Sequence, residues 1–547
     1  MSQSGMEPPI GWTAGKKITI PANSIDADLS SFPLPVYLNN TNFDFTKCKA
    51  DGSDIRFTDK NLNPLKFERK EHFNATSKAT YNVQVPTITD LTDTEIYMWY
   101  GNPNAYNASM EAWQDMTGKQ LTYNGNVNLG WDSGLGRRVA KFDGSGDYFS
   151  LADSEDWNYN NDFCMEYDIN FSVLPTTTIY QMLYTQRYSN STELYLTIRN
   201  TAGVYSLNLG NYNNSINFST NYAFVINTRY KITVSREGNV FRMFVNGVQI
   251  GSNYTNATAL TDVASLLYIG CYLSMGTTPA NFFNGNIYGL RITKGRGRYT
   301  TTFTPPTTFD IDGTDVVFCS NFDTVYDSNY AMVQHMGDTL VDASGNGNNG
   351  TNFGTTVVDT EFGKARSFDG NGYITIPHNL ALKTTHYTLS ALIKPSAYPT
   401  DGWGKSITQT SEVGSYLGRT LAISDIAGHD NVVWANHGNG SSAWLSAYGT
   451  TIIPLSGYSV AHSSHNVTSL KAFLNGIMES SIIGSASVGY GTTPEYIGAN
   501  YGLIAARKFN GIMSERRNSN IARSDAWVKA ESLGLKNELL LIEEVEL

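Results

Sequence analysis

Cysteine and charged residues are scarce in this chain of 547 residues. The four cysteines, at positions 48, 164, 271 and 319, show no paired spacing. This pattern argues against a disulfide framework or a zinc knuckle and is typical of a protein that folds in a reducing cytosol. Charged residues make up only 16% of the sequence, whereas Gly (49) and Tyr (33) are abundant. That composition favours β-sandwich domains over helical or disordered ones.

Basic stretches and long apolar runs are also missing. The net charge is −11, and the most basic segment, residues 294–298 (KGRGR), is short. Nucleic-acid binding requires a basic surface that displaces counterions, so we expect no nucleic-acid partner. No run of 18 apolar residues occurs, so no membrane insertion is expected. Residues 1–9 have neither the basic nor the apolar part of a signal peptide, which predicts synthesis in the cytoplasm without secretion by that route.

The sequence does contain a long internal duplication. Residues 142–148 (FDGSGDY) recur as 368–373 (FDGNGY), and 241–247 (FRMFVNG) recur as 470–476 (LKAFLNG). Three further pairs keep the same order: 115–118 with 342–345, 268–270 with 496–498, and 283–285 with 509–511. The offsets lie between 226 and 229 residues. Such constancy indicates two copies of one domain, and the unit is too long for a solenoid repeat.

Both copies show the period-two alternation of β-strands. Phe241, Met243 and Val245 share one face of a predicted strand, as do Leu470, Ala472 and Leu474 in the second copy, and we expect both sets in the core. An Asn-Gly pair follows each strand and predicts a tight hairpin. Five further strands are predicted in the leader, at residues 16–20, 34–38, 54–58, 80–85 and 95–100. A helix is predicted from Asp525 to Leu533, capped by Ser524 and stopped by Gly534, and residues 539–542 are predicted as a last strand.

Several motifs resemble known families. The second copy resembles the laminin-G-like branch of the concanavalin A-like jelly rolls through residues 342–347 (DASGNG), 362–365 (FGKA), 368–370 (FDG), 474–476 (LNG) and 521–527 (IARSDAW). The first copy has a variant, residues 292–295 (ITKG), 298–300 (RYT) and 303–307 (FTPPT), that resembles bacteriophage virion proteins. The leader resembles an uncharacterised β-rich domain that precedes such jelly rolls, through residues 51–57 (DGSDIRF) and 96–102 (IYMWYGN).

The resemblance implies an all-β chain of three β-sandwich domains with one short C-terminal helix. We assign residues 1–109 to an N-terminal β-sandwich, 110–312 to the first laminin-G-like jelly roll and 313–547 to the second. In relatives the leader runs directly into a sequence like residues 325–330 (VYDSNY). The first jelly roll therefore reads as an insertion, which predicts that the leader packs against the second copy.

Residues 166–171 (EYDINF) resemble the active strand of laminarinase-type hydrolases. That chemistry needs two carboxylic acids and a helper carboxylate that alternate along the strand. Asn170 stands at the acid position, and the aligned strand of the second copy, residues 389–393 (LSALI), carries no acid. We therefore expect an ordinary sandwich strand and no enzyme activity. The two histidines of residues 462–465 would point to opposite faces of a strand, which argues against zinc.

Two kinds of binding site are candidates in the second copy. Asp342, Asn346 and Asn348 lie in a Gly/Asn-rich turn whose oxygen atoms suit a structural calcium ion; the alternative is that Asp342 closes its own turn through an Asx hydrogen bond. A carbohydrate site needs exposed aromatic rings with polar neighbours. The candidates, all in Gly/Ser-rich segments of the second copy, are Trp403, Trp434, His437, Trp444 and Tyr448. Core packing is the alternative for each.

Together these patterns predict a non-enzymatic bacteriophage virion protein, tail-associated or capsid-decorating, that binds carbohydrate and serves in host adhesion. We expect it to be multi-copy or homo-oligomeric, with other virion proteins and host surface glycans as partners. Weak contacts to sugars gain avidity when many copies are displayed on one particle. The alternative is a glycan-degrading enzyme or its carbohydrate-binding accessory module.

Overall fold

A computed structural model of the chain describes residues 9–110, 115–132, 134–135, 137–189, 192–211, 215–260, 262–274, 278–410, 416–484 and 488–545. The segment read above for a signal peptide lies almost entirely outside these residues. The contacts divide the chain into two units, one formed by Met1–Ala105 with Thr324–Leu547 and the other by Tyr106–Asp323. The second unit is thus one continuous stretch placed within the sequence of the first. Every named sheet is antiparallel, which confirms the all-β class.

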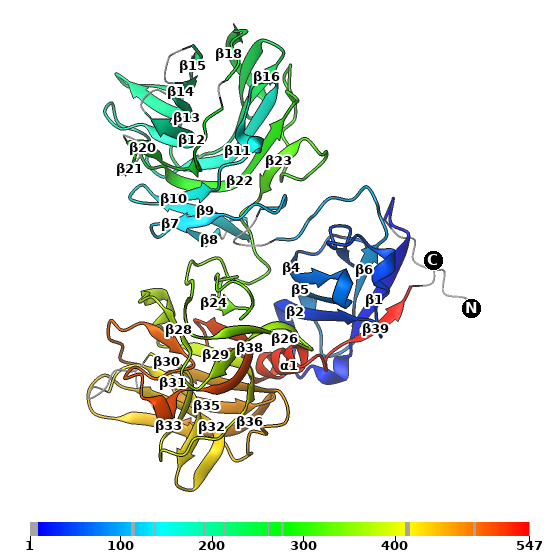
Figure 1. Cartoon of the computed structure of the whole chain (residues 1–547), viewed down its shortest axis with the longest axis vertical. Helices are drawn as coiled ribbons and strands as arrows, with labels where there is room; N and C mark the ends of the chain where they lie inside the picture. The colour runs from blue at the N-terminus through cyan, green and yellow to red at the C-terminus, as the bar shows by residue number, and fades with distance from the viewer. Residues whose placement is uncertain are drawn as a thin grey trace. The chain divides into compact units, whose positions relative to one another are not determined.

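The N-terminal domain is a sandwich of two small sheets (Figure 1). One sheet has the strand order β3-β6-β1-β39 and the other has β2-β5-β4. The five strands expected from the sequence are present, and β4, with the charged sequence FERKEHF, was not expected. The bounds are β1 (Ala14–Ile20), β2 (Leu29–Asn39), β3 (Arg56–Asp59), β4 (Phe67–Phe73), β5 (Lys78–Ile88), β6 (Thr94–Tyr100) and β39 (Leu541–Glu544). The last strand of the chain therefore completes a sheet of its first domain.

The unit Tyr106–Asp323 is a jelly roll of two large sheets around one apolar core. One sheet has the order β15-β14-β13-β12-β19-β10-β7, and the other has β18-β17-β16-β11-β22-β9-β8 with β23 also paired to β22. The bounds are β7 (Thr122–Asn124), β8 (Asn128–Asp132), β9 (Arg137–Asp143), β10 (Tyr148–Leu151), β11 (Phe163–Phe171), β12 (Gln181–Ser189), β13 (Thr192–Thr201), β14 (Val204–Asn211), β15 (Asn217–Asn221), β16 (Arg229–Glu237), β17 (Val240–Val245), β18 (Val248–Thr255), β19 (Leu267–Ile269), β20 (Tyr272–Ser274), β21 (Thr278–Ala280), β22 (Asn284–Lys294) and β23 (Val316–Ser320).

The second jelly roll repeats this topology. Its sheets have the orders β25-β28-β37-β30-β31-β32-β33 and β26-β27-β38-β29-β34-β35-β36, with β24 also paired to β38. The bounds are β24 (Tyr330–Gln334), β25 (Thr351–Phe353), β26 (Thr356–Thr360), β27 (Gly363–Asp369), β28 (Tyr373–Ile376), β29 (Tyr387–Pro395), β30 (Gly404–Gln409), β31 (Arg419–Ile426), β32 (His429–Gly438), β33 (Trp444–Tyr448), β34 (Ser459–Asn466), β35 (Ser469–Leu474), β36 (Ile477–Ile483), β37 (Glu495–Ile497), β38 (Asn510–Ser519) and the helix α1 (Asp525–Leu535). The six expected core residues of β17 and β35 are all buried, at 0–3% exposure.

The Asn-Gly hairpin is the same in both copies. Asn246 and Asn475 have φ of 52° and 51°, and the glycines that follow have φ of 79° and 82°. Two consecutive positive φ angles are the signature of a type I′ turn. Each glycine also lies under a covering segment: the chain at Phe303 in the first copy and α1 in the second. Phe303 and Pro305, which lie in the Thr/Pro-rich residues 300–308 near the end of the first copy, therefore pack against its hairpin rather than lying in a free linker.

A buried aspartate accepts hydrogen bonds in the first turn of each copy. The strand that donates to it precedes the aspartate in the second copy and lies at the far end of the domain in the first. Asp342 accepts a hydrogen bond from Val333 N, nine residues earlier on β24. Asp115 accepts one from Cys319 N, which lies 204 residues later on β23. The first jelly roll therefore takes this strand from its C-terminal end, so its two ends lie together. Such proximity of ends is what domain insertion requires.

Two expected boundaries differ from the structure. The helix α1 continues past Gly534 and ends at Leu535, because Gly534 is buried and packs near Pro35. Residues 313–323 were assigned to the second copy, yet they include β23, which pairs with β22 of the first copy. In both places a contact made by the folded chain overrides the local breaker signal of the sequence.

Candidate functional site: an aromatic groove on the second jelly roll

One face of the seven-stranded sheet of the second jelly roll carries a groove, which we call the aromatic groove. Alternation along each strand separates the groove from the core: Val433 and Ala435 point inward and are fully buried, whereas Trp434 and Asn436 point outward. The groove has a volume of about 380 Å³. Its lining residues are Trp403, Gly404, Ser406, Gln409, Thr420, Ile426, Trp434, Asn436, Trp444, Ser446, Tyr448, Asn500, Tyr501 and Arg507.

The floor of the aromatic groove is a row of polar side chains. Gln409 pairs with Thr420, Thr420 with Asn436, and Asn436 with Ser446 across four neighbouring strands. Residues that pair directly across antiparallel strands point to the same face. The row therefore offers amide and hydroxyl groups in line, perpendicular to the strands.

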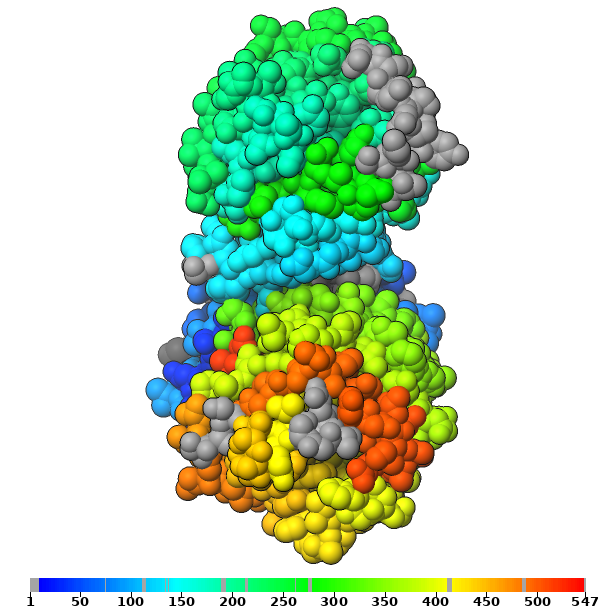
Figure 2. All heavy atoms as spheres, turned by 90° about the vertical axis from the view of Figure 1, so that its left-hand side faces the viewer, coloured from blue at the N-terminus to red at the C-terminus, as the bar shows by residue number. Residues whose placement is uncertain are grey.

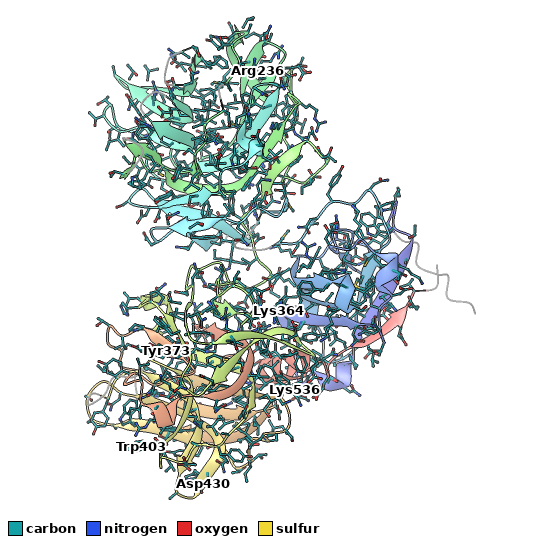
Figure 3. The ribbon with its side chains drawn as sticks, viewed as in Figure 1. Arg236, Lys364, Tyr373, Trp403, Asp430 and Lys536 are labelled. Carbon is teal, nitrogen blue, oxygen red and sulfur yellow. The ribbon has the colours of Figure 1, made fainter. Side chains whose placement is uncertain are left out.

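Aromatic rings form the walls of the aromatic groove. Trp434 and Tyr448 are cross-strand partners and stack with ring centroids 5.9 Å apart and an interplanar angle of 13°. Trp403 and Trp444 are 53% and 39% exposed, which is unusual for so large an apolar side chain. The guanidinium of Arg507 lies 4.8 Å from the centre of the Trp403 ring, and its Nε donates to Asp401 at 2.9 Å. These contacts hold the ring of Trp403 in place; Figure 3 labels this residue on the second jelly roll.

Two polar atoms in the aromatic groove have no hydrogen-bond partner within the described residues. They are Asn436 Oδ1 and Trp434 Nε1. Asn436 is only 7% exposed. A buried polar atom without a partner costs free energy, on the order of 1–3 kcal/mol, unless a ligand or water satisfies it. Both atoms belong to outward-facing residues of β32, so a buried acceptor and a buried donor without a partner among the described residues border the aromatic groove.

Four of the five residues predicted for carbohydrate binding meet in the aromatic groove, and the fifth does not. His437 is fully buried and points between the two sheets, where its ring lies 4.1 Å from that of His465 and its Nδ1 lies 3.4 Å from Tyr387 Oη. Burial lowers the pKa of His437 to about 3 and keeps the ring neutral. His437 lies three positions after Trp434, and this odd spacing places the two side chains on opposite faces of the strand. His437 is therefore a core residue.

Sequence reasoning missed most of the floor and part of the rim. Thr420, Asn436 and Ser446 are common residue types, and only the strand register brings them into one row. Tyr501 and Arg507 come from the loop after β37, which carries no motif. The spacing of Trp434 and Asn436, two positions apart, was the local signal available for Asn436.

The three predicted calcium ligands make hydrogen bonds within their own turn and to the neighbouring strand β24. The carboxylate of Asp342 accepts from Val333 N, Ser344 N, Ser344 Oγ and Asn348 N at 2.7–3.0 Å. The side-chain amides of Asn346 and Asn348 donate to main-chain oxygens of β24. Asp115 makes similar bonds in the first copy, and burial raises its pKa to about 6. These contacts favour the alternative in which Asp342 closes its own turn. No group of three or more His, Cys, Asp and Glu suited to a metal ion occurs among the described residues.

The carboxylates of the strand that resembles a hydrolase active strand are held in ion pairs. Glu166 is 1% exposed and accepts from Arg291 Nε and Nη2 at 2.7 and 2.9 Å. Asp168 lies 2.6 Å from Arg229 Nη2 and 2.5 Å from Lys231 Nζ. Both carboxylates point away from the core of the sandwich, since the residues between them belong to that core. Both carboxylates are thus paired with basic side chains.

The second copy explains why Glu166 has no aligned counterpart. Ser390 pairs with Arg517 at the position where Glu166 pairs with Arg291. Arg517 instead lies 3.1 Å from Glu531 of α1. The buried arginine is common to both copies, and each copy supplies the carboxylate from a different element.

In the first jelly roll, the described residues at the positions of Trp434 and Tyr448 are not aromatic. Asn208 pairs with Ser219 where the second copy pairs Trp434 with Tyr448. Gly210 stands where Asn436 does, and the Tyr195 side chain lies directly over it. The two copies therefore share a sheet but present different chemical surfaces on it.

Comparisons with known proteins agree with this architecture. The profile of the concanavalin A-like lectin/glucanases superfamily matches residues 143–296 and 368–529, together more than half of the chain. The profile of a domain of unknown function, DUF2341, matches residues 51–132. No curated protein matches the chain. Within the described residues, no helix is long and apolar enough to cross a membrane.

Three solved structures illustrate the range of similar folds. Domain 4 of AbnA, an extracellular GH43 arabinanase from Geobacillus stearothermophilus, solved with arabinotriose, is 20% identical, and the match covers 37% of this chain and 97% of that one with a TM-score of 0.32. Domains LG4-5 of the mouse laminin alpha1 chain are 11% identical, with coverage of 74% and 92% and a TM-score of 0.26. Tailspike protein 2 of bacteriophage CBA120 is 11% identical, with coverage of 39% and 33% and a TM-score of 0.28.

Proposed function

Since the chain belongs to the concanavalin A-like lectin/glucanases superfamily, we propose that it binds carbohydrate through the aromatic groove of its second jelly roll. The observation that carries this proposal is the pair of unpartnered atoms, Asn436 Oδ1 and Trp434 Nε1, within a wall of exposed rings. Flat aromatic faces pack against the apolar faces of sugar rings, and the acceptor and donor match hydroxyl groups at the ring edge. Concave sites with apolar walls and a few polar groups are typical of small-molecule binding.

The proposed role is binding without catalysis. The described lining of the aromatic groove contains no Asp or Glu, whereas glycoside hydrolysis uses a pair of carboxylic acids. Glu166 and Asp168 are neutralised by basic side chains in the first jelly roll. Hydrolysis of a bound glycan that is lost in Glu166→Gln would instead favour the alternative, a glycan-degrading enzyme or its accessory module.

We propose a virion surface as the setting, with the protein as a tail-associated or capsid-decorating adhesin of a bacteriophage. The support is the resemblance of residues 292–307 to bacteriophage virion proteins. Many copies on one particle, held by other virion proteins, would convert weak binding of host surface glycans into stable attachment. Mass spectrometry of purified virions tests this setting separately from sugar binding.

A glycan array tests the binding itself. The full-length chain is made multivalent by display on streptavidin beads. It should bind a subset of the glycans on the array. Tyr448→Ala removes part of the stacked wall and should abolish retention, whereas Tyr180→Ala, which removes an exposed tyrosine of the first jelly roll, should leave it unchanged. Equal retention by both variants, or none by the wild-type protein, would refute the proposal.

A further inference from the structure

A second group of aromatic side chains lies on the same sheet face, beyond the aromatic groove. We call Phe353, Tyr373 and Tyr496 the distal aromatic strip. Tyr373 and Trp403, which belong to the strip and the groove respectively, are labelled on the same side of the domain in Figure 3, and that side faces the viewer in Figure 2. The strip was not among the residues expected from the sequence.

The distal aromatic strip points away from the core. Ile374, Ile376 and Ile497 on the same strands are fully buried in the core, so alternation directs Tyr373 and Tyr496 outward. Phe353 pairs directly with Tyr373, and their rings stack 4.8 Å apart at 8°. Phe353 is 43% exposed. Packing of the core therefore does not account for these rings.

The distal aromatic strip and the aromatic groove are continuous. The rings of Tyr373 and Tyr496 are 6.3 Å apart, and those of Tyr496 and Tyr501 are 6.4 Å apart. Tyr501 also lines the aromatic groove. Tyr496 pairs with Gln409, which extends the polar row of the floor by one more strand. Aromatic and polar side chains thus follow one path across the sheet, perpendicular to the strands.

The length of this path decides what it fits. Strands β28, β37, β30, β31, β32 and β33 are consecutive neighbours, and five strand intervals span ~24 Å. One sugar ring cannot contact both Tyr373 and Tyr448. We propose that the site binds an interior stretch of a linear polysaccharide, laid across the strands with several consecutive sugars in contact. This inference rests on the proposed carbohydrate-binding function and specifies its ligand.

The charges along the path favour a neutral polysaccharide. Arg507 donates to Asp401 and stacks on Trp403. Lys508 donates to Asn371 O at 2.9 Å, and its Nζ lies 5.0 Å from the centre of the Tyr373 ring. Both cations therefore brace aromatic rings and already have oxygen partners. The remaining groups on the path are hydroxyls, amides and rings, which suit uncharged sugars.

Titration calorimetry with oligosaccharides of increasing length tests the inference on the full-length chain. The probes are linear β-glucan, xylan and arabinan oligomers of two to eight sugars, with polygalacturonate oligomers as the acidic comparison. For the oligomers that bind, affinity should keep rising beyond three sugars. Tyr373→Ala should weaken octamer binding by about tenfold, the loss of one aromatic stacking contact, and leave trimer binding unchanged. Trp434→Ala should weaken both.

The first jelly roll offers a matched control. Tyr148 begins β10 as Tyr373 begins β28, and its ring lies 6.0 Å from that of Tyr268 on β19, as the ring of Tyr373 lies 6.3 Å from that of Tyr496 on β37. Tyr148→Ala should change neither titration. An affinity that stops rising at the trimer, with no effect of Tyr373→Ala, would overturn the inference while the groove remains a carbohydrate site. Preference for the acidic oligomers would overturn the neutral assignment. Absence of binding by every probe would overturn the inference, and the glycan array would then decide separately whether the proposed function stands.

Discussion

The His335→Gln substitution removes a buried cation that joins the N-terminal domain to the second jelly roll. His335 Nε2 lies 3.1 Å from Glu68 Oε2 on β4, and Nδ1 lies 2.9 Å from Glu515 Oε2 on β38. Lys70 and Arg517 also approach Glu515, at 3.5 and 3.0 Å. Burial alone would favour the neutral imidazole, but the two carboxylates outweigh it and raise the pKa of His335 to about 9.

The raised pKa fixes both the size and the sign of the effect. A histidine with a pKa of 6.5 unfolded and about 9 folded contributes about 3 kcal/mol to stability when it is charged in the fold. The contribution is complete below pH 6.5, declines as the pH rises towards 9, and is absent above it. Glutamine keeps polar contacts to the carboxylates without the charge. We therefore expect the variant to be less stable than the wild type by up to about 3 kcal/mol at pH 6, with a smaller difference at pH 9.5.

Urea denaturation of both full-length proteins, followed by tryptophan fluorescence between pH 6 and 9.5, measures this difference. His429→Gln is a suitable control because His429 is an exposed histidine of the same domain that stacks on Tyr448. A His335→Gln variant whose difference from the wild type is the same at every pH would refute the assignment of a charged, bridging His335.

Three further predictions concern the separate parts of the chain. Chelation with EDTA should leave the Tm unchanged, because four donors already bind the carboxylate of Asp342. Asp342→Ala should lower the free energy of unfolding by about 2–4 kcal/mol. A decrease of the Tm in EDTA that calcium reverses would support the calcium site instead. Arg291→Met leaves buried Glu166 with only Tyr299 Oη at 3.0 Å and Arg298 Nε at 3.6 Å. It should destabilise the first jelly roll by up to about 3–5 kcal/mol, and the double variant with Glu166→Leu should recover much of that loss in thermal unfolding. Residues 106–323, expressed alone, should fold with dispersed amide NMR signals, because they have their own core and adjacent ends; a collapsed spectrum would contradict their independence.

Period-two patterns and hairpin signals predicted strands and core faces, whereas the jelly-roll fold was predicted from the resemblance to a known family. The alternation of Phe241, Met243 and Val245, and of their counterparts in the second copy, identified core faces that the structure confirms. The strand β4 was not predicted because its charged residues look like those of a solvated loop. In the fold Glu68 and Lys70 meet partners of the second jelly roll, so the reason for their burial lies more than 240 residues away in the sequence.

The aromatic groove was predictable only in part. Aromatic residues in Gly/Ser-rich segments predicted Trp403, Trp434, Trp444 and Tyr448 as carbohydrate-binding residues. The same criterion also selected His437, whose side chain points into the core because of strand alternation. The polar floor depends on the register between β30, β31, β32 and β33. Register is set by long-range pairing, which a local pattern does not contain.

Native gel electrophoresis is the most direct test of carbohydrate binding by the aromatic groove. The wild-type chain and Trp434→Ala are run in gels that contain a soluble polysaccharide of a type that binds in the glycan array. We predict that the wild-type chain is retarded in proportion to the polysaccharide concentration and that Trp434→Ala migrates as it does without polysaccharide, with an unchanged circular dichroism spectrum. Equal retardation of the two proteins would place the binding elsewhere on the molecule and contradict the account.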